Sequence, residues 1–217
     1  MLTAREYFFV WAAALATLLV LAHFAAAKED RSSLRLGIGG GAFANLCVVC
    51  VGSSLGQGDV TAWLAPIVEE AVRTWCVFRL LADSPLTGRS STTFAAGSGS
   101  LEPSINLATA VFTGALSFTA LGAAGLILVT VTPFAAQAAL SLLMCTLATY
   151  GARAWVGFAV CATLHALYNN WGLAVTYEDN AAHYARLTLE RLAILVPLSV
   201  LLWFAIRRRS QADETGL

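Results

Sequence analysis

The sequence predicts an all-α protein, a polytopic bundle of transmembrane helices. The chain has 217 residues, of which 58% are hydrophobic and only 12% charged. A soluble domain usually has about 45–50% apolar and about 25% charged residues. The mean hydropathy is correspondingly high, at +0.72. This composition argues against a soluble enzyme and against a disordered chain, and we expect a single integral membrane domain over residues 1–217.

Seven apolar segments are each long enough to cross a bilayer as a helix, which takes about 20 residues. The first is longer than the roughly 7–15 apolar residues of a signal peptide, so we expect it to stay in the protein. The apolar stretch between Glu102 and Gly151 is interrupted by glycines and a proline, and we divide it into two crossings. The predicted spans are 6–27, 36–56, 60–82, 103–124, 130–151, 154–176 and 188–206.

The basic residues predict the orientation of these spans. Most of them fall in loops on one side, together with the C-terminal tail: Lys28, Arg31, Arg35, Arg89, Arg153 and Arg207–Arg209. Basic residues are enriched on the cytoplasmic side, so we expect an outside N-terminus and a cytoplasmic C-terminus. A polar helix over 92–113 would give eight spans and a weaker charge bias. The compact chain, without eukaryotic targeting signals, favours a bacterial inner membrane.

Two adjacent glutamates lie inside an apolar span, where an ionisable group costs several kcal/mol and indicates a functional site. Glu69 and Glu70 precede Arg73 by four and three residues, so Arg73 can pair with one of them. Two carboxylates in a dry site do not both ionise cheaply, so we expect one to be held as an anion and the other to exchange a proton with water. General acid–base hydrolysis needs this division. The alternative is an ion pair that only locks helix packing.

A second polar cluster lies in the span 154–176. His165 and Asn169 are spaced i and i+4, so they share a helix face, and His165 lies at a depth comparable with that of the glutamates. We expect a functional pair, although a single histidine also serves as a hydrogen-bonding residue between helices. Asn45 and Gln137 are isolated polar residues in other spans, and we expect them to form interhelical hydrogen bonds.

The glycine-rich segment 97–106 contains a third acid, Glu102. It either reaches the same cavity as a third carboxylate or lies at the start of a helix, with Pro103 in the first turn. The sequence leaves both possibilities open. For His23, near a helix end, and His183, in a predicted outside loop, we expect no chemical role.

With these residues identified, the chain resembles the glutamic-type intramembrane proteases. This superfamily includes the PrsW-type enzymes and the CAAX-protease and bacteriocin-processing (CPBP, or Abi) family. The resemblance rests on P-x-x-E-E-x-x-R from Pro66 to Arg73, on the glycine-rich segment ending in Glu102, and on His165 with Asn169 and Gly172. The spacing of the basic residue favours the PrsW-like branch. The resemblance covers residues 60–176, the expected catalytic core.

The resemblance implies a helical bundle around a hydrated cavity and hydrolysis of a peptide bond in or near the membrane. Glu69 or Glu70 would activate a water molecule as general base, and Arg73 would set the charge of the pair. His165 and Asn169 would orient that water or stabilise the oxyanion. The expected substrate is a membrane protein or a lipidated peptide, and nucleic acid is not an expected partner.

Three alternatives remain open at this point. Glu69, Glu70 and His165 could hold zinc, but no H-E-x-x-H pattern is present, and we expect no cofactor. The chain could be a transporter or channel subunit that uses the buried acids and histidine as a proton relay, which would require an inverted repeat or broken helices that we do not find. It could also be a non-catalytic scaffold on the same fold.

Overall fold

The computed structural model describes residues 4–26, 28–52, 63–112, 118–173 and 181–215. The helices are α1 (Ala4–Ala25), α2 (Lys28–Gly52), α4 (Ala65–Asp83), α5 (Gly88–Phe112), α6 (Phe118–Thr149), α7 (Ala154–Leu173) and α8 (Ala181–Thr215). The described residues contain these helices and no strand, which confirms the predicted all-α class.

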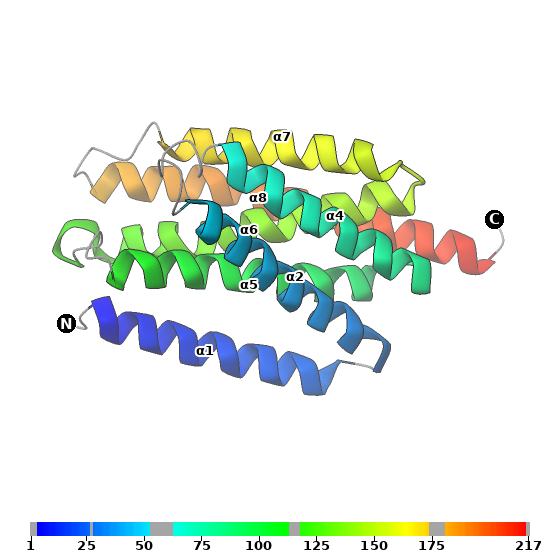
Figure 1. The fold of residues 1–217 in the computed structure, drawn as a ribbon, viewed down its shortest axis with the longest axis horizontal. Helices are drawn as coiled ribbons and strands as arrows, with labels where there is room; N and C mark the ends of the chain where they lie inside the picture. The colour runs from blue at the N-terminus through cyan, green and yellow to red at the C-terminus, as the bar shows by residue number, and fades with distance from the viewer. Residues whose placement is uncertain (1–3, 27, 53–62, 113–117, 174–180, 216–217) are drawn as a thin grey trace.

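Successive helices run in opposite directions through an elongated bundle (Figure 1). Helix α6 packs against α4, α5, α7 and α8, and α2 packs against α4 and α5. Helix α1 lies at the edge of the bundle, on α5. Because of this up-and-down course, the first turns of α2, α5 and α7 lie at the end of the bundle where α8 finishes.

Two predicted loops are wrong because helices begin earlier than hydropathy indicates. Residues 28–35 belong to α2, and most of 83–102 belongs to α5, which begins at Gly88. Thr87 Oγ1 accepts a hydrogen bond from the Ser90 amide at 3.1 Å, and Ser90 Oγ accepts one from the Thr87 amide at 2.9 Å. This reciprocal cap satisfies amides that a helix start leaves without intrahelical partners. A cap of this kind starts a helix in a polar segment.

The predicted loop at 125–129 is also wrong, because α6 is one helix from Phe118 to Thr149 with Pro133 in its interior. Glycine and proline are tolerated in membrane helices when neighbouring helices satisfy the backbone groups that they free. The polar stretch 92–113 is helical as far as Phe112, within α5. The eight-span alternative required this polar helix in addition to the two predicted spans 103–124 and 130–151. Residues 118–149 form a single helix in place of parts of those two spans, so the described residues contain no eighth helix.

Two further expectations about helix ends are wrong. Helix α8 extends beyond 188–206 on both sides and includes His183, which we expected in a loop. Glu102 and Pro103 lie inside α5 and not at the start of a helix. The side chains of Glu102 and His183 are outside the described part of the structure.

The distribution of side chains indicates a membrane protein. Among the residues that the structure describes, three helical segments are long and apolar enough to cross a membrane, fewer than the seven predicted spans: Asp30–Cys50, Thr130–Thr149 and Arg186–Ala212. Large hydrophobic side chains face outward, among them Leu201 at 67% exposure, whereas Glu70 is completely buried. Soluble proteins rarely show such an arrangement. Trp63 and Trp155 are exposed beside the starts of α4 and α7, at opposite ends of the bundle, as is typical of interfacial aromatic residues.

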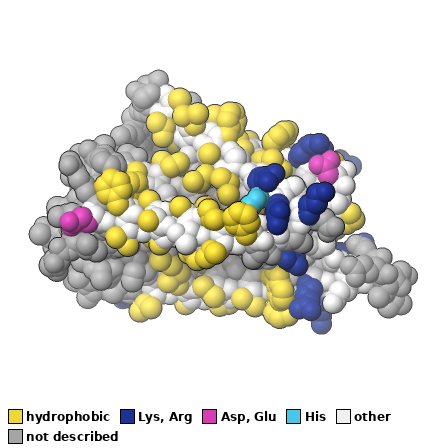
Figure 2. Space-filling model, turned by 90° about the horizontal axis from the view of Figure 1, so that it is seen from below, with side chains coloured by type: hydrophobic (Ala, Val, Ile, Leu, Met, Phe, Trp, Pro, Cys, Tyr) yellow, Lys and Arg dark blue, Asp and Glu magenta, His cyan; other side chains and the backbone are white. Residues whose placement is uncertain are grey.

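Basic side chains gather at one end of the bundle, which we call the basic end. Lys28 begins α2, Arg89 is in the first turn of α5, Arg153 directly precedes α7, and residues 207–209 lie in the last part of α8. The directions of the helices bring these positions together (Figure 1). Figure 2 shows basic side chains concentrated toward one end of a face, with an acidic side chain among them, and many hydrophobic side chains along the rest of its described part.

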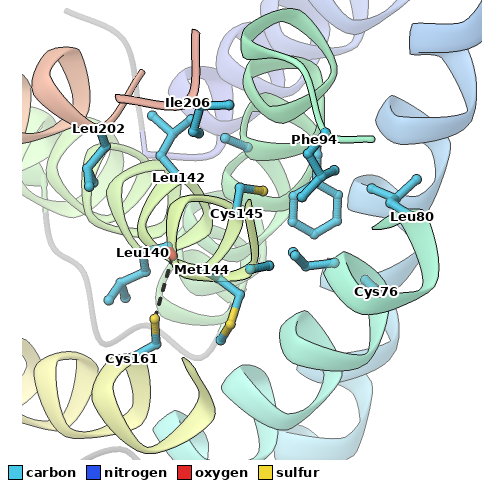
Figure 3. Close-up of a cluster of buried hydrophobic side chains, with 14 residues drawn as sticks. Cys76, Leu80, Phe94, Leu140, Leu142, Met144, Cys145, Cys161, Leu202 and Ile206 are labelled. Carbon is cyan, nitrogen blue, oxygen red and sulfur yellow. Dashed lines mark hydrogen bonds between the residues drawn. The ribbon is translucent and has the colours of Figure 1, made fainter. Parts of the chain in front are cut away.

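The hydrophobic core is a cluster of buried side chains from α4, α5, α6, α7 and α8 (Figure 3). Along α4, α6 and α7 it lies on the side of the polar residues that faces the basic end. Met144 and Cys145 of α6 are completely buried in it, and Cys76 of α4 and Cys161 of α7 pack around them. The Cys161 thiol lies 3.8 Å from the backbone oxygen of Leu140. Packing in the core therefore holds α4, α6 and α7, the helices that carry the candidate site, against one another.

Helices α2 and α5 cross with their backbones in direct contact. A Cβ atom on Gly37 would lie 2.5 Å from the backbone oxygen of Phe94, and one on Gly97 would lie 2.6 Å from that of Leu34. No residue with a side chain fits at such distances without a shift of the backbone. The crossing holds α2 close to α4, where a Cβ on Gly40 would lie 2.7 Å from Cys76 Sγ.

Candidate functional site

Helix α4 supplies three of the candidate residues. Pro66 lies in its first turn, where the missing N–H has no intrahelical acceptor to lose. Glu69, Glu70 and Arg73 follow, and all three are buried. The Arg73 guanidinium forms an ion pair with Glu70 Oε1 through Nη1. The structure thus selects Glu70 as the acid that pairs with Arg73.

Gln137 of α6 connects the cation to the other acid. Its Oε1 accepts a hydrogen bond from Arg73 Nη2, and its Nε2 donates one to Glu69 Oε2 at 3.0 Å. The two neighbours therefore fix the orientation of the amide, with its oxygen toward the Arg73 guanidinium and its nitrogen toward the Glu69 carboxyl oxygen. Gln137 is only 2% exposed. The predicted interhelical hydrogen bond exists, and it lies within the candidate site.

His165 of α7 completes the cluster. Its Nδ1 lies 2.9 Å from Glu70 Oε1, and its Nε2 lies 3.3 Å from Gln137 Nε2 and 3.8 Å from Glu69 Oε2. The amide nitrogen of Gln137 can only donate, so His165 Nε2 accepts in that hydrogen bond. The ring proton of the neutral histidine then lies on Nδ1, toward Glu70.

The cluster contains two carboxylates and one permanent cation. Arg73 and His165 both contact the same oxygen of Glu70, whereas Glu69 faces the amide of Gln137. Arg73 compensates the charge of Glu70, so Glu69 is the carboxyl group left to exchange a proton in this dry environment. An acid that exchanges a proton beside a histidine is suited to general acid–base chemistry.

A small cavity adjoins the cluster where α2 and α5 close over it. Its volume is about 10 Å³, which is on the order of the space needed for one water molecule. Glu69, Arg73 and Gln137 line it from one side, and Gly37 and Gly40 of α2 line it from another. Glu69 is therefore the acid that faces a space for water, whereas Glu70 is the acid paired with the cation.

The other predicted site residues lie around this cluster. Asn169 is half-buried, one turn beyond His165 on α7. The contacts of His165 described above are with Glu69, Glu70 and Gln137. Asn45 lines the cavity, but its amide donates to Gly41 O at 2.9 Å within α2, and this hydrogen bond is not interhelical. The role of Glu102 as a third carboxylate stays a prediction, because its side chain is not described.

One buried cation was missed at the level of the sequence. Arg191 of α8 is 6% exposed, and its guanidinium lies 4.6 Å from the ring centroid of Tyr168, on α7 near His165. An arginine inside an apolar span is itself a signal, since such residues are rare in membrane helices. Arg191 lies three residues inside the predicted span 188–206, so this signal was present in the sequence.

The zinc alternative would use Glu69, Glu70 and His165 as ligands. One of these acids, Glu70, is already paired with the Arg73 guanidinium through Oε1. Among the residues that the structure describes, no group of three His, Cys, Asp or Glu side chains is arranged to hold a metal ion.

Comparison of the sequence and the structure with known proteins found no match. No family model, no curated protein and no solved structure matches the chain. The function therefore has to be argued from the geometry of the cluster.

Proposed function

We propose that this protein is an intramembrane endopeptidase that hydrolyses a peptide bond with a glutamate-activated water molecule. One observation carries the proposal: Glu69 and Glu70 share a buried site with a single cation, and Glu69 borders a space for water. Hydrolysis requires a base that faces water and an environment in which that base exchanges a proton. A substrate that is a membrane protein or a lipidated peptide agrees with a site enclosed by apolar helices.

The geometry supports a division of labour within the cluster. Glu69 takes a proton from the water as its oxygen attacks the peptide carbonyl, and the proton then passes to the leaving nitrogen as the C–N bond breaks. Glu70 remains an anion beside Arg73 and fixes the tautomer of His165. The Gln137 amide donates to Glu69 Oε2 and to His165 Nε2, and so orients the base beside the water molecule. Each group thus has a distinct task.

The full proposal includes seven spans with an outside N-terminus and a cytoplasmic C-terminus. The basic end supports it, because an odd number of crossings places the tail at residues 207–209 on the same side as the loops before α2, α5 and α7. Basic residues mark the cytoplasmic side. A bacterial inner membrane is the proposed location.

The test is proteolysis in liposomes with a panel of single-span and lipidated reporter peptides. We expect Glu69→Gln to lower turnover by about 10²–10⁴-fold, the usual contribution of a general base. Glu70→Gln and His165→Ala should also abolish cleavage, and EDTA should have no effect. Glu190→Gln is the matched control, since Glu190 pairs with Arg186 on the exposed surface of α8 at 2.6 Å. Cleavage that survives Glu69→Gln, or that EDTA stops, would contradict the mechanism.

A non-catalytic scaffold is the second candidate, and the small volume of the cavity favours it. A space of about 10 Å³ does not admit a peptide, so catalysis requires the helices to separate. A scaffold requires no such motion and would use the cluster to hold α4, α6 and α7 together. If no reporter is cleaved and Glu69→Gln matches wild type in cells, the scaffold is the better account. A proton relay would instead show proton flux in liposomes that Glu69→Gln stops.

A further inference from the structure

A hollow of about 220 Å³ lies on the outer face of the bundle, between α1 and α2. Its walls are apolar, with Val20 and Phe24 from α1 and Leu34 and Ile38 from α2. Two basic side chains also line it, His23 and Arg35. We call this hollow the α1–α2 groove. It is separate from the Glu69 cavity, which lies on the other side of α2 toward α4.

The groove exists because α1 and α2 pack on a third helix. The indole of Trp11 donates a hydrogen bond to Ser104 Oγ on α5 at 3.0 Å, and α2 meets α5 at the close crossing of Gly37. The two helices meet at the basic end and diverge from there along the bundle (Figure 1). The crevice between them is left open to the surroundings.

The groove has a cationic rim at its basic end. Arg35 is exposed, and no described residue forms an ion pair with it. The nearby acid Asp30 is buried and paired with Arg89 at 2.6 Å, so its charge is directed toward α5 and away from the groove. Lys28 and Arg31 lie in the same first turn of α2. Figure 2 shows His, Lys and Arg side chains side by side where a hydrophobic face ends.

We infer that the α1–α2 groove binds an anionic phospholipid of the bilayer. The phosphate contacts Arg35 and His23, and one acyl chain lies along the apolar wall beside Val20 and Phe24. The position fits a lipid, because the helix ends at the basic end lie at the level of the headgroups, and basic pockets between membrane helices on that side bind anionic headgroups. The inference depends on the membrane orientation and not on peptidase activity.

The test uses the full chain purified in a neutral detergent. Dioleoyl phosphatidylglycerol and dioleoyl phosphatidylcholine, which share their acyl chains, are added separately, and bound lipid is counted by native mass spectrometry. We expect retained adducts with phosphatidylglycerol only. Each basic residue near an anionic surface strengthens binding by about fivefold, so Arg35→Gln should weaken the adduct by about that factor. Arg153→Gln is the matched control, since Arg153 is exposed at the same end but does not line the groove.

A second pair of variants tests the acyl-chain site independently of charge. Val20→Trp fills the groove, whereas Val10→Trp places the same side chain on an equally exposed position of α1 outside it. Loss of the phosphatidylglycerol adduct in Val20→Trp alone supports the inference. Equal binding of both lipids, equal weakening by Arg35→Gln and Arg153→Gln, or normal binding by Val20→Trp would each overturn it. Melting temperatures without added lipid verify that every variant is folded.

Discussion

Replacement of Gln137 by leucine should destabilise the fold, whether or not the protein is a peptidase. The side chains are similar in size, so the substitution leaves no large cavity. It removes the acceptor of Arg73 Nη2 and the donor to Glu69 Oε2, both in a buried site. The Arg73 guanidinium and the Glu69 carboxyl group would each lose a hydrogen-bond partner in a buried site.

The expected loss is about 2–3 kcal/mol. Removing one partner of a hydrogen bond to a buried charged group costs about 1.5–3 kcal/mol. Hydrogen bonds measured between membrane helices are weaker, on average about 0.6 kcal/mol and at most about 1.7 kcal/mol. Because both partners of Gln137 are buried ionisable groups, and Arg73 is permanently charged, we take values near the upper end of the membrane range for each of the two bonds.

The assay is reversible unfolding in mixed micelles by titration with sodium dodecyl sulfate. Gln211→Leu is the control, since Gln211 is exposed at the end of α8 and its replacement should change stability by less than about 0.5 kcal/mol. A double-mutant cycle of Gln137→Leu with Glu69→Gln should give a coupling energy of about 1 kcal/mol. Wild-type stability in Gln137→Leu, or a coupling energy of zero, would refute the described network.

Three more predictions concern charge, packing and orientation. Arg73→Met should cost about 3–5 kcal/mol because it leaves a buried carboxylate unpaired, whereas Arg79→Met, which breaks an exposed pair, should cost less than about 1 kcal/mol in the same titration. Gly37→Ala should lower stability by about 1–3 kcal/mol through overpacking, but Gly39→Ala, with no atom within 4 Å of the new Cβ, should not. Ser210→Cys should react with a membrane-impermeant maleimide only in inside-out vesicles, and labelling from the outside would reverse the proposed topology.

The local part of the candidate site could be predicted from the sequence. Glu69 and Glu70 precede Arg73 by four and three residues on one helix, and this spacing brings both acids within reach of Arg73. The polar residues of α7 could be recognised because an apolar helix contains few of them. Short-range geometry of this kind depends only on the helical repeat.

The contacts between helices could not be predicted. Gln137 is 64 residues from Arg73 and 28 from His165, so their meeting depends on how α4, α6 and α7 pack. The choice of Glu70 over Glu69 as the ion-pair partner likewise follows from the position of the neighbouring helices. An isolated glutamine in a span signals an interhelical hydrogen bond but does not identify its partner.

The predicted helix boundaries were wrong where the hydropathy of a segment does not indicate whether the segment is helical. Residues 88–102 are polar, yet the Thr87 cap and the close contact of Gly97 with α2 make them helical. Residues 125–129 contain a glycine in an apolar stretch, and the continuous helix passes through them. Hydropathy measures how well a segment fits lipid, whereas a helix inside a bundle is also stabilised by its protein neighbours.

The order in which the cluster residues leave the ribosome has a consequence for membrane insertion. Helix α4 carries its own cation, so Glu70 is partly neutralised as soon as that helix forms. The partners from other helices are synthesised later, because Gln137 lies 68 residues after Glu69 and His165 lies 95 residues after Glu70. Until α6 and α7 have been synthesised, the insertion machinery or water has to keep the acidic side chains of α4 out of contact with lipid. The polar contacts that the cluster makes between helices are therefore complete only after α7 has been synthesised.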